Sequence, residues 1–593
     1  MKKLCLYLSI IILIAGCKLS NSNQTLQDNT ELSALLDKYY EERLQLFPVE
    51  ATSIGDNRYN DKLYVDFTDS YRKKLKEFYN RNLVYITKFE RDALNDNDKL
   101  SYDAFKREME INIEGLGFHD NYFPLNQFSS MHLVFGQLGS GSVIQPFKTV
   151  ADYDNWLKRM AVFPAYVDSV IVYFKKGIAE GYVLPKPLVV KMIPQMQAMV
   201  VSDVTKSLFY GPVTNLPAAF SGDDKKRLTD AYTTAINQQI TPSFKRLGDF
   251  LQNEYLPKAR TTTGISGIPG GDKYYSYLIR QQTTTNKTPD EIYNTGLSEV
   301  KRIRTEMETI KTQVGFTGDL KSFFIYLQKD KKFTPYKTPK EILDAFETIH
   351  KTMEPNLKKM FGHTPKTPFE IRQTEAFRAA SASAEYNQGS ADGSRPGIFY
   401  IPILDATTFN TTSGMESLFL HEAIPGHHYQ ISLQQENEKL PKFRRFGGNN
   451  AYAEGWALYC ESLGKELGLY TDPYQYMGAL GDEMHRAIRL VVDVGMHTKN
   501  MTREEAIQYM MDNEQLSEEG TVAEIERYMA IPAQALGYKI GALKIRELRN
   551  KYEQQQGANF NIASFHDTIL QDGNLPLDVL EKKMDAWAEK QKK

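Results

Sequence analysis

Residues 413–430 read SGMESLFLHEAIPGHHYQ, and this is the most informative stretch of the chain. Ser413 and Glu416 have the spacing of a capping box, so we expect a helix to begin directly after the serine. His421 and Glu422 then lie on that helix. A histidine next to a glutamate on a helix places a metal ligand beside a general base.

The second ligand does not follow at the usual spacing. Four residues after the first histidine, where a helical second ligand is expected, the chain has Pro425. On a regular helix His427 would lie about 9 Å along the axis from His421. Pro425 removes a helical hydrogen bond and Gly426 permits unusual dihedral angles, so this pair can fold the chain back. Alternatively the pair simply ends the helix, and either His427 or His428 could be the second ligand.

A third ligand is expected in residues 450–461, which read NAYAEGWALYCE and have a helical pattern. Glu454 lies among small and aromatic residues, where a carboxylate is costly to bury unless a cation pairs with it. Together with His421 and His427 it would leave one position of a tetrahedral zinc ion free for water. Glu461 is a candidate either for the acceptor behind a ligand histidine or for the ligand itself. Either glutamate could instead be a surface carboxylate.

Further polar residues lie within apolar helical patterns. Arg489, Asp493 and His497 are spaced four apart and so share one helix face. The ordinary interpretation of that spacing is a salt bridge with a capping histidine. Tyr528 and Tyr538 could donate hydrogen bonds to a developing oxyanion, but packing in the core explains a lone tyrosine as well.

The N-terminus has the pattern of an export signal. Two lysines precede an apolar run over residues 4–14, which is too short to span a bilayer. The run ends in the tetrapeptide IAGC, which resembles a bacterial lipobox, so we expect cleavage before Cys17 and acylation of its thiol. A generic secretory signal is the alternative. Residues 1–16 would be the signal peptide and residues 17–30 the lipidated cysteine and a flexible tether.

Composition narrows the classes of function. The 593 residues contain 72 Lys and Arg against 74 Asp and Glu, so no basic excess is present to bind nucleic acid. No apolar stretch after the signal approaches the length of a membrane span. We therefore expect a lipoprotein anchored to a membrane of the cell envelope and facing the periplasm or the exterior. After processing only Cys460 is free, which excludes an intramolecular disulfide and a cysteine-based zinc cluster.

Helical periodicity dominates the rest of the chain. Capping boxes begin at Thr288 and Thr502, and the best strand signal is residues 397–403. The glycines in residues 264–271 indicate a break. We therefore expect a mainly α fold with one large domain over residues 31–593, which has an N-terminal helical lobe to about residue 265 and a catalytic lobe after it.

Several segments resemble the bacterial family catalogued as domain of unknown function 885. They are HEAIPGHH (421–428), NAYAEGW (450–456), RAIRLVVDVGMH (486–497), ERYMAIPAQALGYKIG (526–541), SRPGIFYIP (394–402) and IPGGDKYYSYLIRQQTTTNKTPDEIYNTG (268–296). These blocks span about half of the chain, and the HExxPGH pattern is specific. Members are regarded as zincin-like helical metallopeptidases, many of them lipoproteins.

The resemblance implies roles for individual residues. It favours His427 over His428 as a ligand, because the family pattern tolerates tyrosine at the second place. The family is similar in layout to helical gluzincins of the neurolysin and angiotensin-converting-enzyme type. By that similarity residues 397–401 would form an edge strand that holds the substrate backbone. The groups that stabilise the tetrahedral intermediate would be His497, Tyr528 and Tyr538. Candidates for substrate contacts are Arg395, Tyr400, His428 and Arg489.

The sequence thus predicts a two-lobed zincin-like helical peptidase with a small β-sheet beside the active-site helix. One Zn²⁺ held by His421, His427 and Glu454 would hydrolyse peptide bonds in oligopeptides, with Glu422 as the general base. The alternative is a non-catalytic envelope lipoprotein that binds peptide or metal, which would not need Glu422 beside the first ligand. No GxSxG segment supports a serine mechanism. The pattern predicts neither the cleavage specificity nor the oligomeric state.

Overall fold

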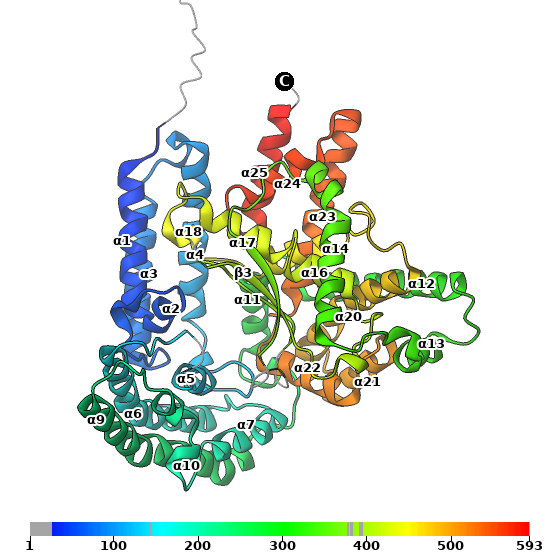
Figure 1. The fold of residues 1–593 in the computed structure, drawn as a ribbon. Helices are drawn as coiled ribbons and strands as arrows, with labels where there is room; N and C mark the ends of the chain where they lie inside the picture. Colours follow the sequence, from blue (N-terminus) through cyan, green and yellow to red (C-terminus); the bar gives the residue numbers. More distant parts are fainter. Residues whose placement is uncertain (1–26, 142–143, 376–378, 380–382, 391–394, 592–593) are drawn as a thin grey trace, which may run out of the picture.

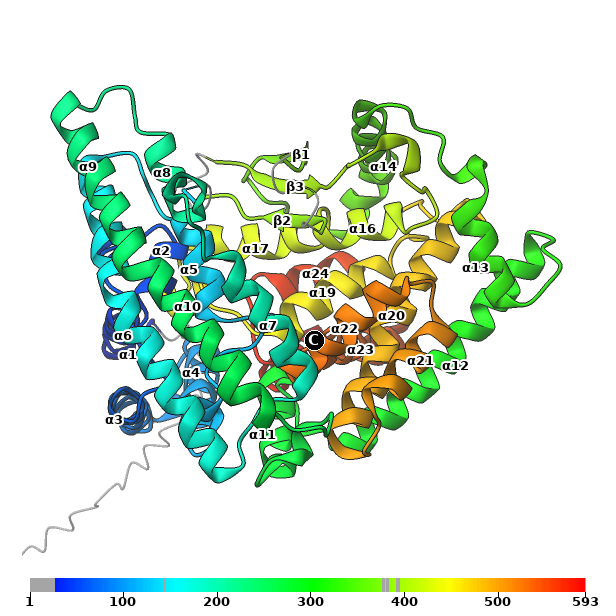
Figure 2. The same cartoon turned by 90° about the horizontal axis from the view of Figure 1, so that it is seen from below.

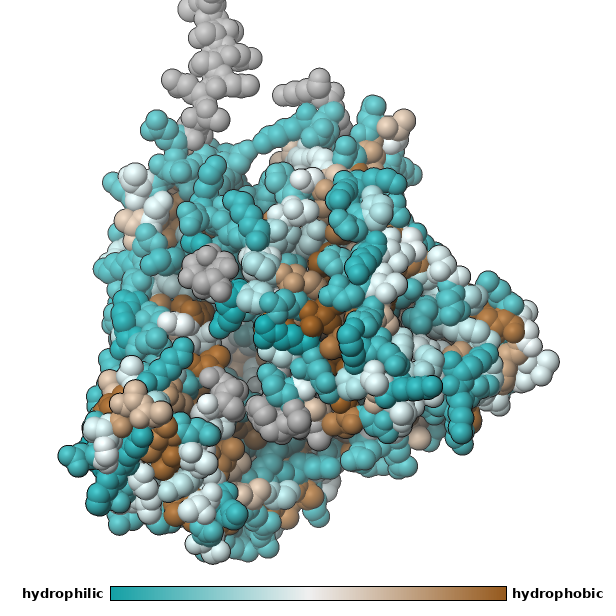
Figure 3. Space-filling view, viewed as in Figure 1, coloured by the Kyte–Doolittle hydropathy of each residue, from teal (hydrophilic) through white to brown (hydrophobic). Residues whose placement is uncertain are grey.

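A computed structural model describes residues 27–141, 144–375, 379, 383–390 and 395–591. The predicted signal peptide and Cys17 lie outside these residues. The described chain is mainly helical with one three-stranded sheet, as the sequence predicted. No described helix is long and apolar enough to cross a bilayer. The face in Figure 3 is mostly hydrophilic, with small hydrophobic areas scattered over it.

The helices before residue 265 line one side of the molecule, and the longest of them run side by side (Figures 1 and 2). They are α1 (Thr30–Leu46), α2 (Pro48–Ser53), α3 (Asp69–Ile86), α4 (Asp96–Gly115), α5 (Met131–Gly139), α6 (Val150–Glu180), α7 (Lys186–Ala198), α8 (Gly211–Thr214), α9 (Gly222–Ala235) and α10 (Thr241–Phe250). Large aromatic side chains such as Trp156 and Phe163 of α6 are fully buried between these helices. Their burial stabilises this side of the molecule.

The second part of the chain holds the sheet and the segments with the predicted ligands. Its elements are α11 (Gly271–Thr283), α12 (Pro289–Gln313), α13 (Leu320–Lys329), α14 (Pro339–Met360), β1 (Phe369–Gln373), β2 (Glu385–Asn387), β3 (Gly397–Ile401), α16 (Met415–Glu422), α17 (His427–Glu436), α18 (Lys442–Arg445), α19 (Asn450–Glu461), α20 (Pro473–Thr498), α21 (Arg503–Asn513), α22 (Glu518–Ala530), α23 (Leu536–Gln556), α24 (Ile562–Leu570) and α25 (Leu577–Gln591).

The two parts share a hydrophobic core. Met196 of α7 and Leu247 of α10 belong to the same cluster of buried side chains as Met484 and Val492 of α20. The break predicted at residues 264–271 is present, because a short 3₁₀ turn there separates α10 from α11. Helix α20 therefore shares a core with the N-terminal helices, and α22 packs directly against α7.

The sheet has the strand order β1-β3-β2. The predicted strand at Gly397–Ile401 is confirmed, but the expectation that it is an edge strand is wrong. Strand β3 pairs in parallel with β1 and antiparallel with β2, and all five of its residues are buried. A continuous apolar run is typical of a strand with neighbours on both sides. The sheet lies along α16 and α17 (Figure 2), and the rings of Phe369 and Phe399 lie 6.2 and 6.3 Å from that of Phe419 on α16.

Two of the three predicted capping boxes form. Those at Thr288 and Thr502 start α12 and α21 as expected. The box between Ser413 and Glu416 does not form, because α16 is capped by Gly414 without a side-chain bond. The serine hydroxyl donates instead to a backbone carbonyl three residues earlier at 2.6 Å. The start of α16 is nevertheless within one residue of the predicted position.

Helices α19 and α23 cross closely because glycine faces glycine. A Cβ atom added to Gly541 would lie 1.8 Å from the carbonyl oxygen of Ala451 and 2.8 Å from Cα of Gly455. Only glycine permits this approach. The crossing brings Glu454 of α19 and Tyr538 of α23 to the same cavity.

Candidate metal centre

His421 at the end of α16 and His427 at the start of α17 come together with Glu454 from the second turn of α19. One ligand atom from each lies within 4.8 Å of the other two. Nε2 of His421 is 3.5 Å and Nε2 of His427 is 3.6 Å from the same oxygen, Oε2 of Glu454. Ligand atoms around a tetrahedral zinc ion lie roughly 3.4 Å apart, given bonds of about 2.1 Å. The donor set and its spacing therefore fit one zinc ion.

The turn Ala423–Gly426 brings the second histidine back to the first. Its ends have non-helical dihedral angles, φ −102° and ψ −107° at the first residue and φ −69° and ψ −123° at the last. Trp456 of α19 donates its Nε1–H to the carbonyl of Pro425 at 2.9 Å. A Cβ on Gly426 would lie 1.9 Å from the carbonyl oxygen of His421. The turn is thus compatible only with glycine at its last position, and the two imidazole centroids lie 4.9 Å apart.

Glu461 lies behind the first ligand. Its Oε1 accepts a hydrogen bond from Nδ1 of His421 at 2.7 Å, which leaves Nε2 directed at Glu454. Both partners are buried, with 4% of the histidine and 5% of the glutamate exposed. A carboxylate in this place fixes the tautomer and the ring orientation of a ligand histidine. Of the two predicted roles for Glu461, the geometry favours the acceptor behind the ligand.

The charges of this cluster are strongly coupled. Burial disfavours a charge on His421, but hydrogen bonds to Glu454 and Glu461 raise the pKa of the imidazole to about 10. Burial also raises the pKa of Glu454, but its hydrogen bonds to His421 and His427 hold that pKa well below its ordinary value. The buried carboxylates thus require positive charge beside them, and a divalent cation can supply it while both histidines are neutral.

Glu422 lies beside the ligands and is held by the sheet. Its Oε2 accepts a hydrogen bond from the backbone N–H of Tyr386 at 3.0 Å. Tyr386 belongs to β2, so the strand that meets α16 at the cavity is the short edge strand β2 and not β3. The sequence analysis did not identify β2, because three residues within a loop-like composition carry no strand signal.

The ligands and Glu422 line one cavity of about 1020 Å³. Among the residues predicted for substrate contact or catalysis, those that also line it are Arg395, Arg489 and Tyr538. Arg486, which the sequence analysis did not single out, lines it too. A polar residue three positions before Arg489 on an otherwise apolar helix was the available signal.

Comparison with known proteins agrees with the resemblance found in the sequence. The profile of a family described as bacterial protein of unknown function, DUF885, matches residues 48–584. The chain belongs to the DUF885 family. No match was found among curated proteins.

Two solved structures are similar to this DUF885 chain. One is a protein from Colwellia psychrerythraea described as a "putative lipoprotein", with a TM-score of 0.86 at 27% identity over 94% of this chain and 99% of that one. The other, from Shewanella oneidensis, is described as a "putative lipoprotein of unknown function", with a TM-score of 0.72 at 20% identity over 93% and 99%. The second comparison shows the common fold alone.

Other residues predicted for the site of this DUF885 protein do not line the cavity. They are Tyr400, His428, His497 and Tyr528. Tyr400 lies on the central strand β3. His428 is 3% exposed, and its Nδ1 lies 2.9 Å from the hydroxyl of Tyr386, so its ring packs toward the sheet. Burial lowers the pKa of His428 to about 4.

His497 and Tyr528 are fully buried. Nδ1 of His497 accepts from the backbone N–H of Ile265 at 2.9 Å, and Nε2 lies 3.1 Å from the carbonyl oxygen of Tyr528. The histidine thus joins α20 to the turn before α11 and to α22. The hydroxyl of Tyr528 donates to Glu524 at 2.5 Å and accepts from Nε of Arg489 at 2.9 Å. These placements do not support direct contact of either residue with a substrate.

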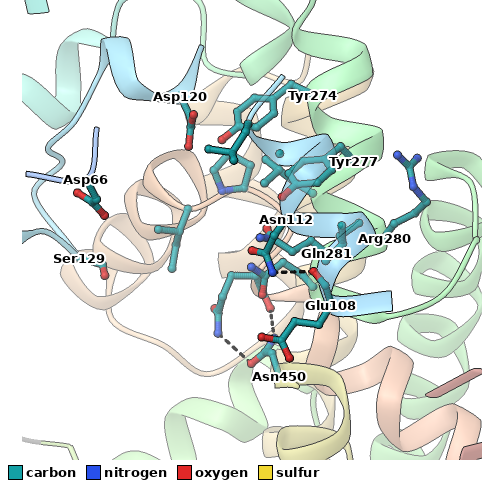
Figure 4. Close-up of a pocket in the computed structure, with 18 of the residues that line it drawn as sticks. Asp66, Glu108, Asn112, Asp120, Ser129, Tyr274, Tyr277, Arg280, Gln281 and Asn450 are labelled. Atoms are coloured by element: carbon teal, nitrogen blue, oxygen red, sulfur yellow. Dashed lines mark hydrogen bonds between the residues drawn. The ribbon is translucent and has the colours of Figure 1, made fainter. Parts of the chain in front are cut away.

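A second cavity of about 1020 Å³ adjoins the first. Gly447, Gly448 and Asn574 line both. Figure 4 shows that carboxylates of the N-terminal part, such as Asp120, and phenols of α11, such as Tyr274, surround it. The interior therefore offers polar space beyond the metal centre, between the N-terminal helices and the second part of the chain.

Proposed function

We propose that this DUF885 protein is a zinc-dependent peptidase that hydrolyses peptide bonds in oligopeptides. One zinc ion would be held by His421, His427 and Glu454. The observation that carries the proposal is the position of Glu422, a carboxylate adjacent to a ligand and held at the cavity by the backbone of β2. When bound, zinc supplies Lewis-acid chemistry that polarises a carbonyl group and lowers the pKa of water.

Proton transfer and stabilisation of the oxyanion are assigned to residues of the chain. Glu422 accepts a proton as the nucleophile forms and delivers it to the leaving amine. Tyr538 lines the cavity as a hydrogen-bond donor for the developing oxyanion. Burial raises the pKa of Tyr538, so its phenol stays protonated and able to donate. The backbone of β2 keeps the carboxylate of Glu422 in place through Tyr386.

The non-catalytic alternative is a lipoprotein that binds peptide or metal in the same cavity. It explains the three ligands and the cavity, but it gives Glu422 no function. A protein that only binds has no proton to move, so it predicts that replacing this carboxylate has little effect. The peptidase proposal predicts the opposite.

We also propose that the chain is a lipoprotein anchored to a membrane of the cell envelope through Cys17, facing the periplasm or the exterior. The support is the lipobox-like tetrapeptide IAGC after an apolar run. The protein from Colwellia psychrerythraea, which is 27% identical to this chain, is described as a "putative lipoprotein".

The deciding experiment compares Glu422→Gln with His421→Ala. Zinc content and hydrolysis of a peptide library are measured for both variants and for wild type. Glu422→Gln should keep stoichiometric zinc and lose about 10²–10⁴-fold in rate, because the amide cannot accept a proton. His421→Ala should lose both metal and activity. Glu347→Gln, on the exposed side of α14, is the matched control and should change neither.

A Glu422→Gln enzyme that hydrolyses peptides near the wild-type rate would end this mechanism. Wild-type protein that takes up no transition metal after zinc is supplied would contradict the ligand assignment.

A further inference from the structure

Two arginines of α20 line the same cavity as the three metal ligands. Arg486 and Arg489 are three positions apart and therefore lie on one side of the helix. Arg489 is 5% exposed, and 18% of the Arg486 side chain is exposed. A buried guanidinium group is costly unless its donors have acceptors, so the partners of these two side chains indicate what else the cavity binds.

Arg489 is held in one orientation by its neighbours. Its Nε donates to the hydroxyl of Tyr528 at 2.9 Å, and its Nη2 donates to Oε2 of Glu524 at 3.2 Å. The ring of Tyr538 lies 4.7 Å from the guanidinium carbon. Nη1 is buried and has no hydrogen-bond partner among the described residues. The group is therefore fixed in place, and the two N–H donors of Nη1 have no acceptor among the described residues.

Arg486 is also incompletely satisfied. Its Nη1 donates to the backbone carbonyl of Asp482 at 3.1 Å, while its buried Nε has no partner within the described part of the chain. Two neighbouring guanidinium groups repel each other, and a shared anion between them removes that repulsion.

The rest of the cavity favours an anion as well. Glu422 is the proposed general base, and Glu454 is a proposed metal ligand. The other charged residues that line the cavity are Arg395, Arg445, Arg486, Arg489 and Glu385. This is a cationic wall in a protein whose overall charge is only −2, so the positive charge is local to the cavity. A carboxylate is the anion that a peptide substrate itself carries, and arginine binds carboxylates with two parallel hydrogen bonds.

The arginines lie close to the metal centre. Tyr538 interacts electrostatically with Glu454 on one side and with Arg489 on the other. Arg486 interacts electrostatically with Glu461, which holds His421, and with Asp482, whose Oδ1 lies 3.4 Å from Nη1. Both arginines and the three proposed ligands line one cavity of about 1020 Å³, so a carboxylate bound by the arginines places the end of a peptide in the cavity that holds the ligands.

We propose that Arg486 and Arg489 bind the free C-terminal carboxylate of the substrate, so that the protein acts as a carboxypeptidase on oligopeptides. This rests on the proposed peptidase function. Water adds across a peptide bond next to the C-terminus: the hydroxyl goes to the carbonyl carbon, and the proton goes to the amine of the released residue or dipeptide. Tyr528 and Glu524 are positioning residues that hold Arg489, which explains a buried tyrosine outside the cavity.

The test compares three N-acetylated peptides. Two have the same sequence and end in a free acid or in the C-terminal amide. The third is the amide with one internal residue replaced by glutamate. Binding to zinc-loaded Glu422→Gln protein is measured by calorimetry, and hydrolysis by wild type is measured in parallel. The free acid should bind about 10- to 100-fold more tightly than the amide, as expected for loss of a hydrogen bond to a charged group. Hydrolysis should release C-terminal residues from the free acid alone.

Arginine variants then assign the preference to residues. In the Glu422→Gln background, Arg486→Gln and Arg489→Gln should bind acid and amide with nearly equal affinity, while Arg489→Lys should keep part of the preference. In otherwise wild-type protein the same changes should raise KM for the free acid far more than they lower kcat. Arg227→Gln, on the exposed face of α9, is the control and should keep the full preference.

The outcomes separate this inference from the proposed function. Equal binding of acid and amide by the Glu422→Gln protein overturns the carboxylate site whether or not the wild type hydrolyses peptides. Equally tight binding of the amide with internal glutamate overturns the assignment to a chain end. A preference for the free acid that depends on the arginines, with no hydrolysis by zinc-loaded wild type, keeps the site but rejects the peptidase. If an arginine variant does not fold, the comparison of acid and amide on unaltered arginines still decides.

Discussion

At the scale of single residues, Glu461 has the clearest supporting role. It is buried and holds Nδ1 of His421 at 2.7 Å. Carboxylates behind a ligand histidine typically strengthen metal binding by 10- to 100-fold. The residue is therefore expected to matter for metal affinity although it is not one of the three ligands.

Glu461→Ala should weaken zinc binding by about 10- to 100-fold while leaving the fold intact. The measurement is competition for zinc with a chelator of known affinity, together with a circular dichroism spectrum. Glu347→Ala on the exposed face of α14 is the control and should bind zinc like wild type. Unchanged zinc affinity in Glu461→Ala would mean that the hydrogen bond to His421 does not support a metal.

His497 makes a prediction about stability instead of catalysis. Burial lowers its folded-state pKa to about 3, below the ordinary value of 6.5. The unfolded chain therefore binds the proton more readily, so the contribution of neutral His497 to stability is complete above about pH 6.5 and is lost as the pH falls toward 3. His497→Gln should lower the free energy of unfolding at pH 8 by about 1–3 kcal/mol, since two buried hydrogen bonds are disturbed.

That difference between wild type and His497→Gln should shrink between pH 6.5 and pH 4. Denaturant unfolding at several pH values measures it, and kcat at pH 8 under stabilising conditions should stay within a few-fold of wild type. A large loss of kcat without a loss of stability would restore the catalytic role that the sequence suggested for His497.

At the scale of elements, the break between α16 and α17 decides whether two histidines become ligands. The turn Ala423–Gly426 joins the helices so tightly that a Cβ on Gly426 would meet the carbonyl oxygens of His421 at 1.9 Å and Leu420 at 2.4 Å. Trp456 holds the turn from α19, the helix that carries Glu454. The helix that carries Glu454, the third proposed ligand, thus also holds the turn that positions His427.

Gly426→Ala should move α17 away from α16 and lower zinc affinity by at least about 10-fold, because metal sites tolerate little displacement of their ligands. Zinc content after dialysis and the melting temperature are measured. Gly222→Ala at the start of α9, where a Cβ meets nothing within 4 Å, is the matched glycine control. Wild-type zinc content in Gly426→Ala would show that the turn has room that the structure does not indicate.

At the scale of the whole molecule, α20 connects the parts. Its side chains contribute to the core shared with the N-terminal helices, its arginines line the metal cavity, and His497 bonds to the turn before α11. The second cavity lies between the same parts (Figure 4). Since a folded domain does not fit into a cavity of about 1020 Å³, we expect unstructured peptides as substrates of the proposed peptidase.

The membrane anchor is a whole-molecule property that the folded part does not need. Cys17→Ser should abolish acylation and cleavage before residue 17, so that the precursor keeps its signal peptide. Peptide hydrolysis per molecule should be unchanged, because α1 begins only at Thr30, the last residue of the predicted tether. Fractionation with immunoblotting checks the location. Unchanged processing and membrane attachment of Cys17→Ser would reject the lipobox.

The mainly helical fold and the starts of α12 and α21 could be predicted, because they depend on short-range patterns. Thr288 and Thr502 cap their helices through bonds that span three residues. The box at Ser413 failed because longer-range contacts competed: Glu416 bonds instead to the backbone N–H of Tyr470 at 2.6 Å. Strand β3 was recognised by its apolar run, but its central position depends on pairing with distant strands.

The residue types that a metal site needs could be recognised without a structure. They are the adjacent His421 and Glu422, a proline and a glycine where the helix must turn, and the carboxylate of Glu454 among apolar residues. Tertiary structure alone decided which polar residues reach the cavity. Arg489 and His497 share a face of α20, but the two turns between them direct one into the cavity and the other into the core. The physical reason is that spacing along a helix sets the face, while the neighbouring elements set what that face meets at each level.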